Sequence, residues 1–421
     1  MKLKKFYIGF SIFYLIYAII ISLYLFNLKP GFVPEKYRGT VADPTTFMTW
    51  EQIKEAHHLD LIGYFTFFLQ TPLDFLLMIL LMVFSNRLRD KAKTVFKKSF
   101  WQLGFYYLIF TIITTLLYLP LEIFFFYLSH KYNLSNQSLL SAAGDMGISF
   151  GLDILISVPI LWLFYWAVKK FPKRWWLITW GASIPLTVIA MFLIPILIMP
   201  LFNDYKPLEN KELKAEIQKL ADEAGIPDAK ILEMNMSKQT NTINAFVTGF
   251  GSNMQIVIGD TAIKEMNIEQ IKFVMAHEIG HYKLKHIYQG LAVSLVISFF
   301  VIFGTYLLYN FFIKKLGHLW GIDGQDDIAA MPLLLLTVSL ISFPISPLNN
   351  IESRYHEKEA DQYAIDMTQN KEVAISAFQT LTKNIKSTGY EPTPIHFLLG
   401  SHPRITERID FMNKYHLDQE N

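Results

Sequence analysis

The chain has 421 residues, of which 52% are hydrophobic, 15% aromatic and only 18% charged. Soluble domains average about 25% charged residues, so this composition excludes a water-soluble enzyme of this size and indicates a polytopic membrane protein. The net charge of +2 gives no indication of nucleic-acid binding, and the absence of cysteine excludes disulfides, a thiolate metal site and a thiol nucleophile.

Seven apolar segments are each long enough to cross about 30 Å of hydrocarbon as a helix. They lie at residues 6–26, 62–84, 103–128, 148–168, 177–202, 287–313 and 328–348. The first is read as a retained anchor rather than a secretory signal, because its apolar run is too long and no small-residue cleavage site follows it.

The positive charges of the loops predict an orientation. Fifteen Lys and Arg residues lie in the N-terminus and in loops 85–102, 169–176 and 314–327, whereas loops 27–61 and 129–147 hold five. The positive-inside rule therefore predicts a cytoplasmic N-terminus, with the catalytic side outside. The composition and short loops suit a bacterial chain, for which the location would be the plasma (inner) membrane.

Four polar residues fall within the apolar segments, and such residues are costly in hydrocarbon. They are Gln70, Asp74, Glu122 and Asp153. Two interpretations stay open: hydrogen bonding between packed helices, or the lining of a polar chamber.

Two stretches have a water-compatible composition, and we expect them to meet as one domain split by the last two membrane helices. The first should contain a helix at 210–221, strands at 230–234, 244–248 and 255–259 with a turn at 249–253, and a helix from Asn267 to His286. The second should contain two or three further helices. The predicted organisation is therefore a five-helix membrane region at 1–202, catalytic parts at 203–286 and 349–421, and membrane helices six and seven at 287–348.

The helix expected at 268–286 carries the sequence His277-Glu-Ile-Gly-His281. Histidines four residues apart lie on one helix face and can bind a single zinc ion. Glu278 then lies beside the metal, where it can take a proton from a zinc-activated water and pass it to the leaving amine. This spacing in a helix, with the small Gly280 between, favours a zinc hydrolase over a chance match.

A catalytic zinc needs a third protein ligand. His286 is nine residues from His277 and about half a turn off the ligand face. On another segment, Glu357 and Asp361 are four apart and share a face; Glu357 would complete the ligand set, and Asp361 would accept the Nδ1 proton of a ligand histidine, His277 being the expected one. We expect His356 and Glu359, on other faces, at the surface.

These residues resemble the membrane-embedded zinc endopeptidases of the CAAX prenyl protease type. The similarity extends over most of the chain in order and approximate spacing. Besides the seven-segment layout and the zinc helix, it includes Pro200-Leu-Phe-Asn-Asp-Tyr-Lys-Pro-Leu, Asn244-Ala-Phe-Val-Thr-Gly-Phe, the segment from Asn350 to Asp361, and Ser401-His-Pro-Arg-Ile-Thr-Glu-Arg.

The resemblance implies a mostly α integral membrane fold: seven transmembrane helices around a polar chamber, with a zincin-like α+β catalytic domain. It implies one Zn²⁺ per chain, Glu357 as third ligand, and His402 as the donor that stabilises the oxyanion. Arg354 either buttresses the site or binds a substrate carboxylate. Asn244 and Ala245 either belong to an edge strand that pairs with the substrate backbone or simply begin a hairpin strand.

The sequence thus predicts an integral membrane zinc metalloendopeptidase that cleaves near the C-terminus of a membrane-associated or prenylated peptide, with the lipid bilayer as its other partner and no nucleic acid. One alternative keeps the chemistry and changes the substrate, to unfolded membrane proteins in quality control. The other is a seven-helix metal-binding transporter or receptor, although such proteins usually place their ligands inside membrane helices.

Overall fold

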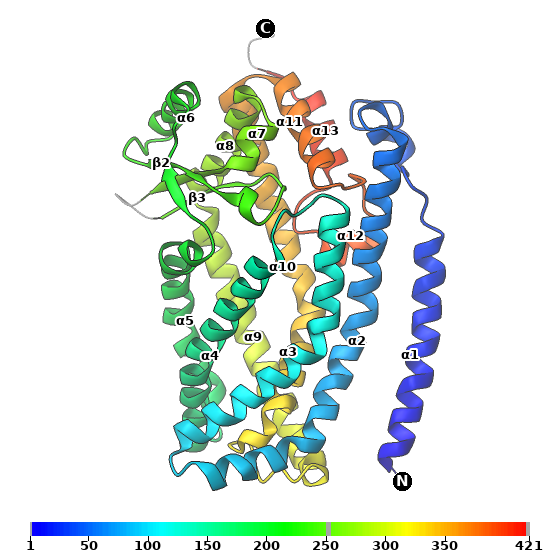
Figure 1. Ribbon diagram of the computed structural model, residues 1–421, viewed down its shortest axis with the longest axis vertical. Helices are drawn as coiled ribbons and strands as arrows, with labels where there is room; N and C mark the ends of the chain where they lie inside the picture. The colour runs from blue at the N-terminus through cyan, green and yellow to red at the C-terminus, as the bar shows by residue number, and fades with distance from the viewer. Residues whose placement is uncertain (1, 250–253, 418–421) are drawn as a thin grey trace.

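The computed structural model describes residues 2–249 and 254–417. Long helices form an elongated bundle, with a smaller mixed domain at one end (Figure 1). The membrane helices in chain order are α1 (Lys2–Phe26), α2 (Trp50–Val95), α3 (Ser99–Lys131), α4 (Leu139–Lys170), α5 (Trp175–Leu193), α9 (His286–Leu316) and α10 (Met331–Thr368).

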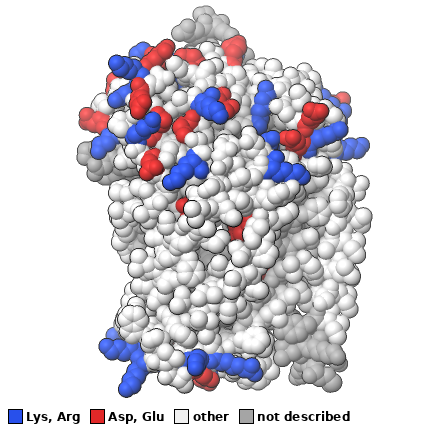
Figure 2. Space-filling model, viewed as in Figure 1, with Lys and Arg blue, Asp and Glu red and all other residues white. Residues whose placement is uncertain are grey.

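Six of these helices are long and apolar enough to cross a membrane, and a bent pair makes a seventh candidate span. In that pair α5 is followed, after a 46° bend, by a short irregular helical stretch that ends at Leu201. Charged side chains gather at the two ends of the face shown in Figure 2, and the broad band between them is nearly free of charge. The protein is an integral, multi-pass membrane protein, as its composition predicted.

Several helices extend well beyond the apolar segments that predicted them. Helix α2 begins in water at a capping box, in which Thr49 and Gln52 satisfy each other's backbone amides. Helix α10 continues for twenty residues past the predicted end of the seventh span at 348. Residue 349 marks a change in polarity but not a helix end, so the membrane span and the first twenty residues of the second catalytic stretch form one continuous helix.

The smaller domain contains a four-stranded sheet in the order β1-β2-β4-β3. Strands β2 and β4 are parallel, while β1 and β3 run antiparallel to their neighbours. The strands are β1 (Tyr205–Pro207), β2 (Lys230–Met234), β3 (Ala245–Thr248) and β4 (Gln255–Gly259). Sequence analysis predicted the last three and missed β1, which has only three residues; the expected turn at 249–253 lies largely outside the described residues.

Helices from both water-compatible stretches surround this sheet. They are α6 (Lys211–Glu223), α7 (Asp260–Glu265), α8 (Ile268–Lys283), α11 (Lys371–Asn384), α12 (Thr393–Leu399) and α13 (Ile405–Lys414). One hydrophobic core joins the sheet to all of these helices except α12: Ile217 of α6, Ile258 of β4, Phe273 of α8, Phe378 of α11 and Ile409 of α13 are all fully or nearly fully buried within it. The two stretches therefore fold as one unit, although α9 and α10 separate them in sequence.

Two of the intramembrane polar residues are hydrogen-bonded between packed helices, and a third borders a cavity with a mostly apolar lining. Tyr107 donates to Asp153 at 2.9 Å, and Tyr118 donates to Asp74, so these carboxylates are hydrogen-bonded between helices. Glu122, in contrast, lines a cavity of about 890 Å³ between α3 and α4.

Candidate metal centre

Helix α8 presents its histidines because its start and its packing are both fixed. Asn267 and Gln270 form a capping box at its N-terminus. Gly280 lets it approach α10 closely: a Cβ at this position would lie 3.0 Å from Cδ1 of Tyr363. The helix ends at Lys283, earlier than the predicted 286, because Lys285 takes a left-handed conformation (φ 61°) and α9 starts at His286.

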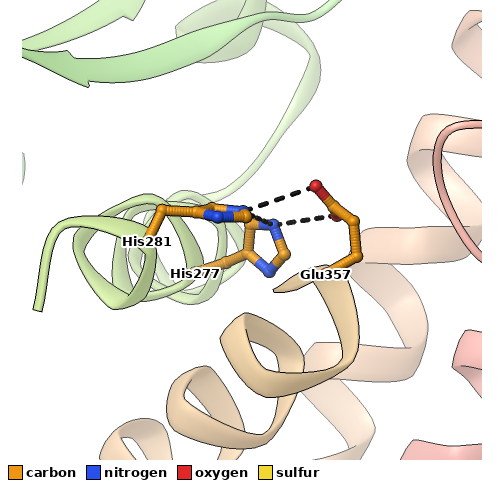
Figure 3. A group of neighbouring side chains, drawn as sticks. All are labelled: His277, His281 and Glu357. Atoms are coloured by element: carbon orange, nitrogen blue, oxygen red, sulfur yellow. Dashed lines mark hydrogen bonds and ion pairs between the residues drawn. The ribbon is translucent and has the colours of Figure 1, made fainter. Parts of the chain in front are cut away.

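The side chains of His277, His281 and Glu357 converge from α8 and α10 (Figure 3). The Nε2 atoms of the two histidines lie 3.1 Å apart. Nε2 of His277 is 3.3 Å from one carboxylate oxygen of Glu357, and Nε2 of His281 is 3.4 Å from the other. Ligands about 2.0 Å from a tetrahedral zinc are about 3.3 Å from one another. Two imidazole nitrogens and a carboxylate at these separations therefore fit a zinc ion.

Asp361 lies directly behind the first histidine, where its Oδ1 atom is 3.0 Å from Nδ1 of His277. Arg408 of α13 donates to both oxygens of Asp361, at 2.8 and 2.6 Å, and approaches Glu357 at 3.4 Å. Arg408 is the last residue of the segment Ser401–Arg408, and its role was not predicted. The sequence shows Arg408 as a cation on an amphipathic helix, but its partner Asp361 lies 47 residues away, so the pairing has no local signal.

Glu278 is partly buried beside the two histidines. Burial raises the pKa of its carboxyl group, and the nearby His277 and His281 oppose that rise. A carboxylate with a raised pKa next to a metal position is suited to accept and return a proton near neutral pH.

His402 reaches the same site from the segment before α13. Its Nε2 atom lies 3.3 Å from Glu357, and its side chain is 59% exposed, so it borders the open side of the centre. Arg354 does not point into the site: it donates to the carbonyl of Gly400 at 2.5 Å. That contact favours the buttressing alternative for Arg354, because it fixes the segment that carries His402.

The expectation that His356 lies at the surface is wrong. Its ring is buried and stacks on His286, with centroids 4.2 Å apart. Nδ1 of His286 lies 3.0 Å from Nδ1 of His281, and its Nε2 atom is 3.3 Å from Glu359, which is only partly exposed. His286 thus lies outside the ligand group, as its spacing predicted, but contacts the back of a ligand. A helix wheel could not reveal this, because the break at Lys285 reorients His286.

Strand β3 lies at the edge of the sheet and places Asn244 and Ala245 at its start. Ala245 is opposite Ile258 of β4, and the Asn244 carbonyl accepts the amide of Gly259 at 3.0 Å. Among the residues that the structure describes, no strand pairs with the other side of β3. It could therefore pair with an extended peptide.

Comparisons with known proteins agree with this arrangement. Residues 207–416 match the family model of peptidase family M48, and residues 48–204 match the model described as CAAX prenyl protease N-terminal, five membrane helices. The uncharacterized metalloprotease YhfN of Bacillus subtilis is 37% identical over 414 residues, which cover 98% of this chain and 97% of the relative.

More distant relatives extend the similarity. CAAX prenyl protease 1 of Saccharomyces cerevisiae is 30% identical over 316 residues, which cover 70% of this chain and 69% of the relative. The crystal structure of S. mikatae Ste24p superposes with a TM-score of 0.80 at 24% identity, over 97% of this chain and 98% of that one. This last match shows that the fold is shared.

Proposed function

The chain belongs to peptidase family M48, and on this premise we propose that it cleaves membrane-associated peptides near their C-termini by zinc-dependent hydrolysis. It is a membrane metalloprotease. The observation that carries the proposal is the convergence of His277, His281 and Glu357 at separations that suit tetrahedral zinc. The centre lies at the end of the bundle, among residues beyond the apolar segments, which argues against a transporter or receptor.

In this proposal His277, His281 and Glu357 hold one zinc ion. When bound, the metal supplies a Lewis acid that polarises the scissile carbonyl and makes water acidic enough to ionise near neutral pH. Glu278 takes the proton from the attacking water and delivers it to the leaving amine, which its raised pKa permits. His402, at the exposed side, donates a hydrogen bond to the oxyanion.

Two further residues position these groups. Asp361 accepts the Nδ1 proton of His277, which leaves Nε2 free to bind metal. Arg408 holds Asp361 through two hydrogen bonds and lies close to Glu357, so it aligns both carboxylates at once.

We propose a CAAX-type substrate: a peptide whose prenyl group stays in the bilayer while its C-terminal segment lies along β3. The free edge of β3 would bind the peptide backbone with little dependence on side chains. A lipid-anchored peptide suits a metal centre that lies just beyond the membrane-spanning segments. Several relatives carry the name CAAX prenyl protease 1 or are called its homologues. The loop charges support a cytoplasmic N-terminus and a catalytic side outside.

The experiment compares a farnesylated CAAX peptide with its unprenylated twin, using purified full-length protein in detergent. Glu278→Gln should retain one zinc per chain and lose turnover, whereas His281→Ala should lose both zinc and turnover. Glu265→Gln, a substitution on α7, serves as the control. Full activity of Glu278→Gln would disprove the mechanism, and equal cleavage of the two peptides would disprove the requirement for a prenyl group.

A further inference from the structure

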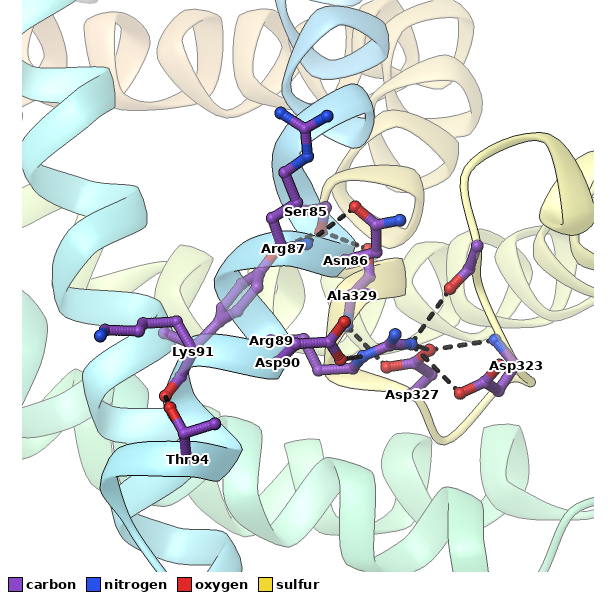
Figure 4. Close-up of polar contacts among 12 residues, drawn as sticks. Ser85, Asn86, Arg87, Arg89, Asp90, Lys91, Thr94, Asp323, Asp327 and Ala329 are labelled. Carbon is purple, nitrogen blue, oxygen red and sulfur yellow. Dashed lines mark hydrogen bonds and ion pairs between the residues drawn. The ribbon is translucent and has the colours of Figure 1, made fainter.

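A second polar site lies at the opposite end of the membrane helices from the metal centre. Its framework is the loop between α9 and α10, which Arg89 of α2 holds in place (Figure 4). Arg89 is paired with Asp327 and lies 3.2 Å from Asp323. Asp327 also accepts the amides of Asp323 and Ala329, each at 3.0 Å. Arg89 and Asp327 are therefore paired with each other, and their contacts hold the loop in one position.

Beside this loop is a cavity of about 510 Å³, within the range of small-molecule sites (about 300–1,000 Å³). The end of α2, the start of α3, the end of α4 and the loop enclose it. The lining includes Lys93, Tyr165, Trp166, Lys169, Asp323 and Asp326.

Several of its polar groups lack partners among the residues that the structure describes. No ion pair or hydrogen bond involves the side chains of Lys93, Lys169 or Asp326. The hydroxyl of Tyr165 is buried without a hydrogen-bond partner, although buried polar groups are normally satisfied. The cavity therefore offers two exposed cations and an acidic wall to a ligand that carries both charges, whereas the buried Tyr165 hydroxyl is closed off from it.

We propose that this cavity binds the headgroup of phosphatidylethanolamine. The phosphate would lie between Lys93 and Lys169, and the ammonium would donate to Asp323 and Asp326. Trp166, 46% exposed near the end of α4, is a residue type that lies at membrane interfaces. A lipid is the source because the cavity lies at the ends of membrane helices.

The acidic wall explains why the headgroup needs a primary amine. A phosphatidylglycerol headgroup would satisfy the lysines but bring no positive charge to Asp323 and Asp326. A choline headgroup carries the positive charge but has no N–H to donate to a carboxylate. Only an ammonium matches both the charge and the hydrogen-bonding capacity of this wall.

The test is lipid retention by purified full-length protein after exposure to an equimolar mixture of phosphatidylethanolamine, phosphatidylcholine and phosphatidylglycerol with identical acyl chains, measured by native mass spectrometry. Wild-type protein should retain phosphatidylethanolamine selectively. Lys93→Ala/Lys169→Ala should reduce its retention about tenfold or more, as expected for loss of charged hydrogen bonds. Lys97→Ala/Lys98→Ala, two exposed lysines nearby, should not change it.

A second variant tests recognition of the amine. Asp326→Asn should still retain phospholipid but shift the preference from phosphatidylethanolamine toward phosphatidylglycerol. Free phosphoethanolamine should compete weakly, since it lacks acyl chains. The proposal is overturned if wild-type protein prefers phosphatidylglycerol, if both lysine pairs behave alike, or if phosphoethanolamine binds as well as the lipid. Peptidase activity, which needs none of these residues, checks that each variant is folded.

Discussion

The Nδ1 atoms of His281 and His286 lie 3.0 Å apart, so that the last residue of the sequence His277-Glu-Ile-Gly-His281 and the first residue of a membrane helix face each other through their rings. If Nε2 of His281 binds a metal, the ring proton is on Nδ1, and this N–H donates a hydrogen bond to Nδ1 of His286. The Nε2–H of His286 then faces Glu359 at 3.3 Å. A histidine here takes the place that a carboxylate or carbonyl usually occupies behind a metal ligand.

We therefore expect His286→Ala to weaken zinc binding about 10–100-fold, the usual cost of losing such a partner. Competition with a chromophoric chelator would measure the affinity directly, independent of peptidase activity. His286→Asn, whose side-chain oxygen can still accept the proton, should lose less. His318→Ala, an exposed histidine near the end of α9, is the control, and wild-type affinity in His286→Ala would refute the role.

Zinc affinity should depend on pH through His277. Burial lowers the pKa of this ring, but hydrogen bonds with Asp361 and Glu357 outweigh burial and raise it to about 9 in the metal-free protein. The ring is thus protonated at pH 7, and zinc must displace that proton. The apparent affinity should rise about tenfold per pH unit up to about pH 9 and then level off. A flat profile between pH 7 and 8.5 would contradict this.

The raised pKa of His277 also makes the stability of the metal-free protein depend on pH, but in the opposite direction to zinc affinity. Because the pKa of His277 is higher in the folded than in the unfolded chain, protonation of His277 stabilises the fold at neutral pH. This contribution is lost as the pH rises through about 9. Thermal unfolding of metal-free and zinc-loaded samples across this range should therefore give midpoints that move apart as the pH increases.

In the zinc-loaded protein, where His277 is neutral, Arg408→Met should cost about 3–5 kcal/mol of stability, because it leaves Asp361 buried and without its cation. Differential scanning fluorimetry would show a lower thermal midpoint. Combining it with Asp361→Asn removes the unpaired charge, so the midpoint should recover in part while zinc affinity stays low. Lys414→Met on the same helix, whose ion pair is exposed, should change little.

The orientation can be tested because the chain contains no cysteine. Single cysteines at the exposed positions Lys97 and Lys211 lie at opposite ends of the bundle. In right-side-out vesicles, a membrane-impermeant maleimide should label Lys211→Cys directly and Lys97→Cys only after the membrane is opened. The reverse pattern would place the catalytic side in the cytoplasm and overturn the orientation inferred from the loop charges.

Much of this fold could be predicted because local signals were strong. The apolar runs fixed which segments are membrane helices, and alternation with flanking turns located β2 and β4 with correct bounds. The predicted ends of the membrane helices were less accurate. Helix α10 continues past residue 348 because polar residues can extend a helix as well as apolar ones. Strand β1 and helix α7 were missed, since three and six residues carry too little periodicity.

The proposed metal ligands could be picked out from the sequence because His277 and His281, and likewise Glu357 and Asp361, follow the helical repeat on their own segments. Arg408, His286 and His356 were not, because their contacts depend on how separate helices pack. Arg408 reaches Asp361 only through the docking of α13 on α10. His356 is buried only because the break at Lys285 turns His286 against it.

The continuity of α10 gives the protein an order of events during its synthesis. The two histidines precede the α9–α10 hairpin in the chain and Glu357 follows it, so the ligand set is complete only once both helices have crossed the bilayer and returned to the same side. A nascent or half-inserted chain holds two ligands and no third. We therefore expect proteolytic competence only after both helices have been inserted.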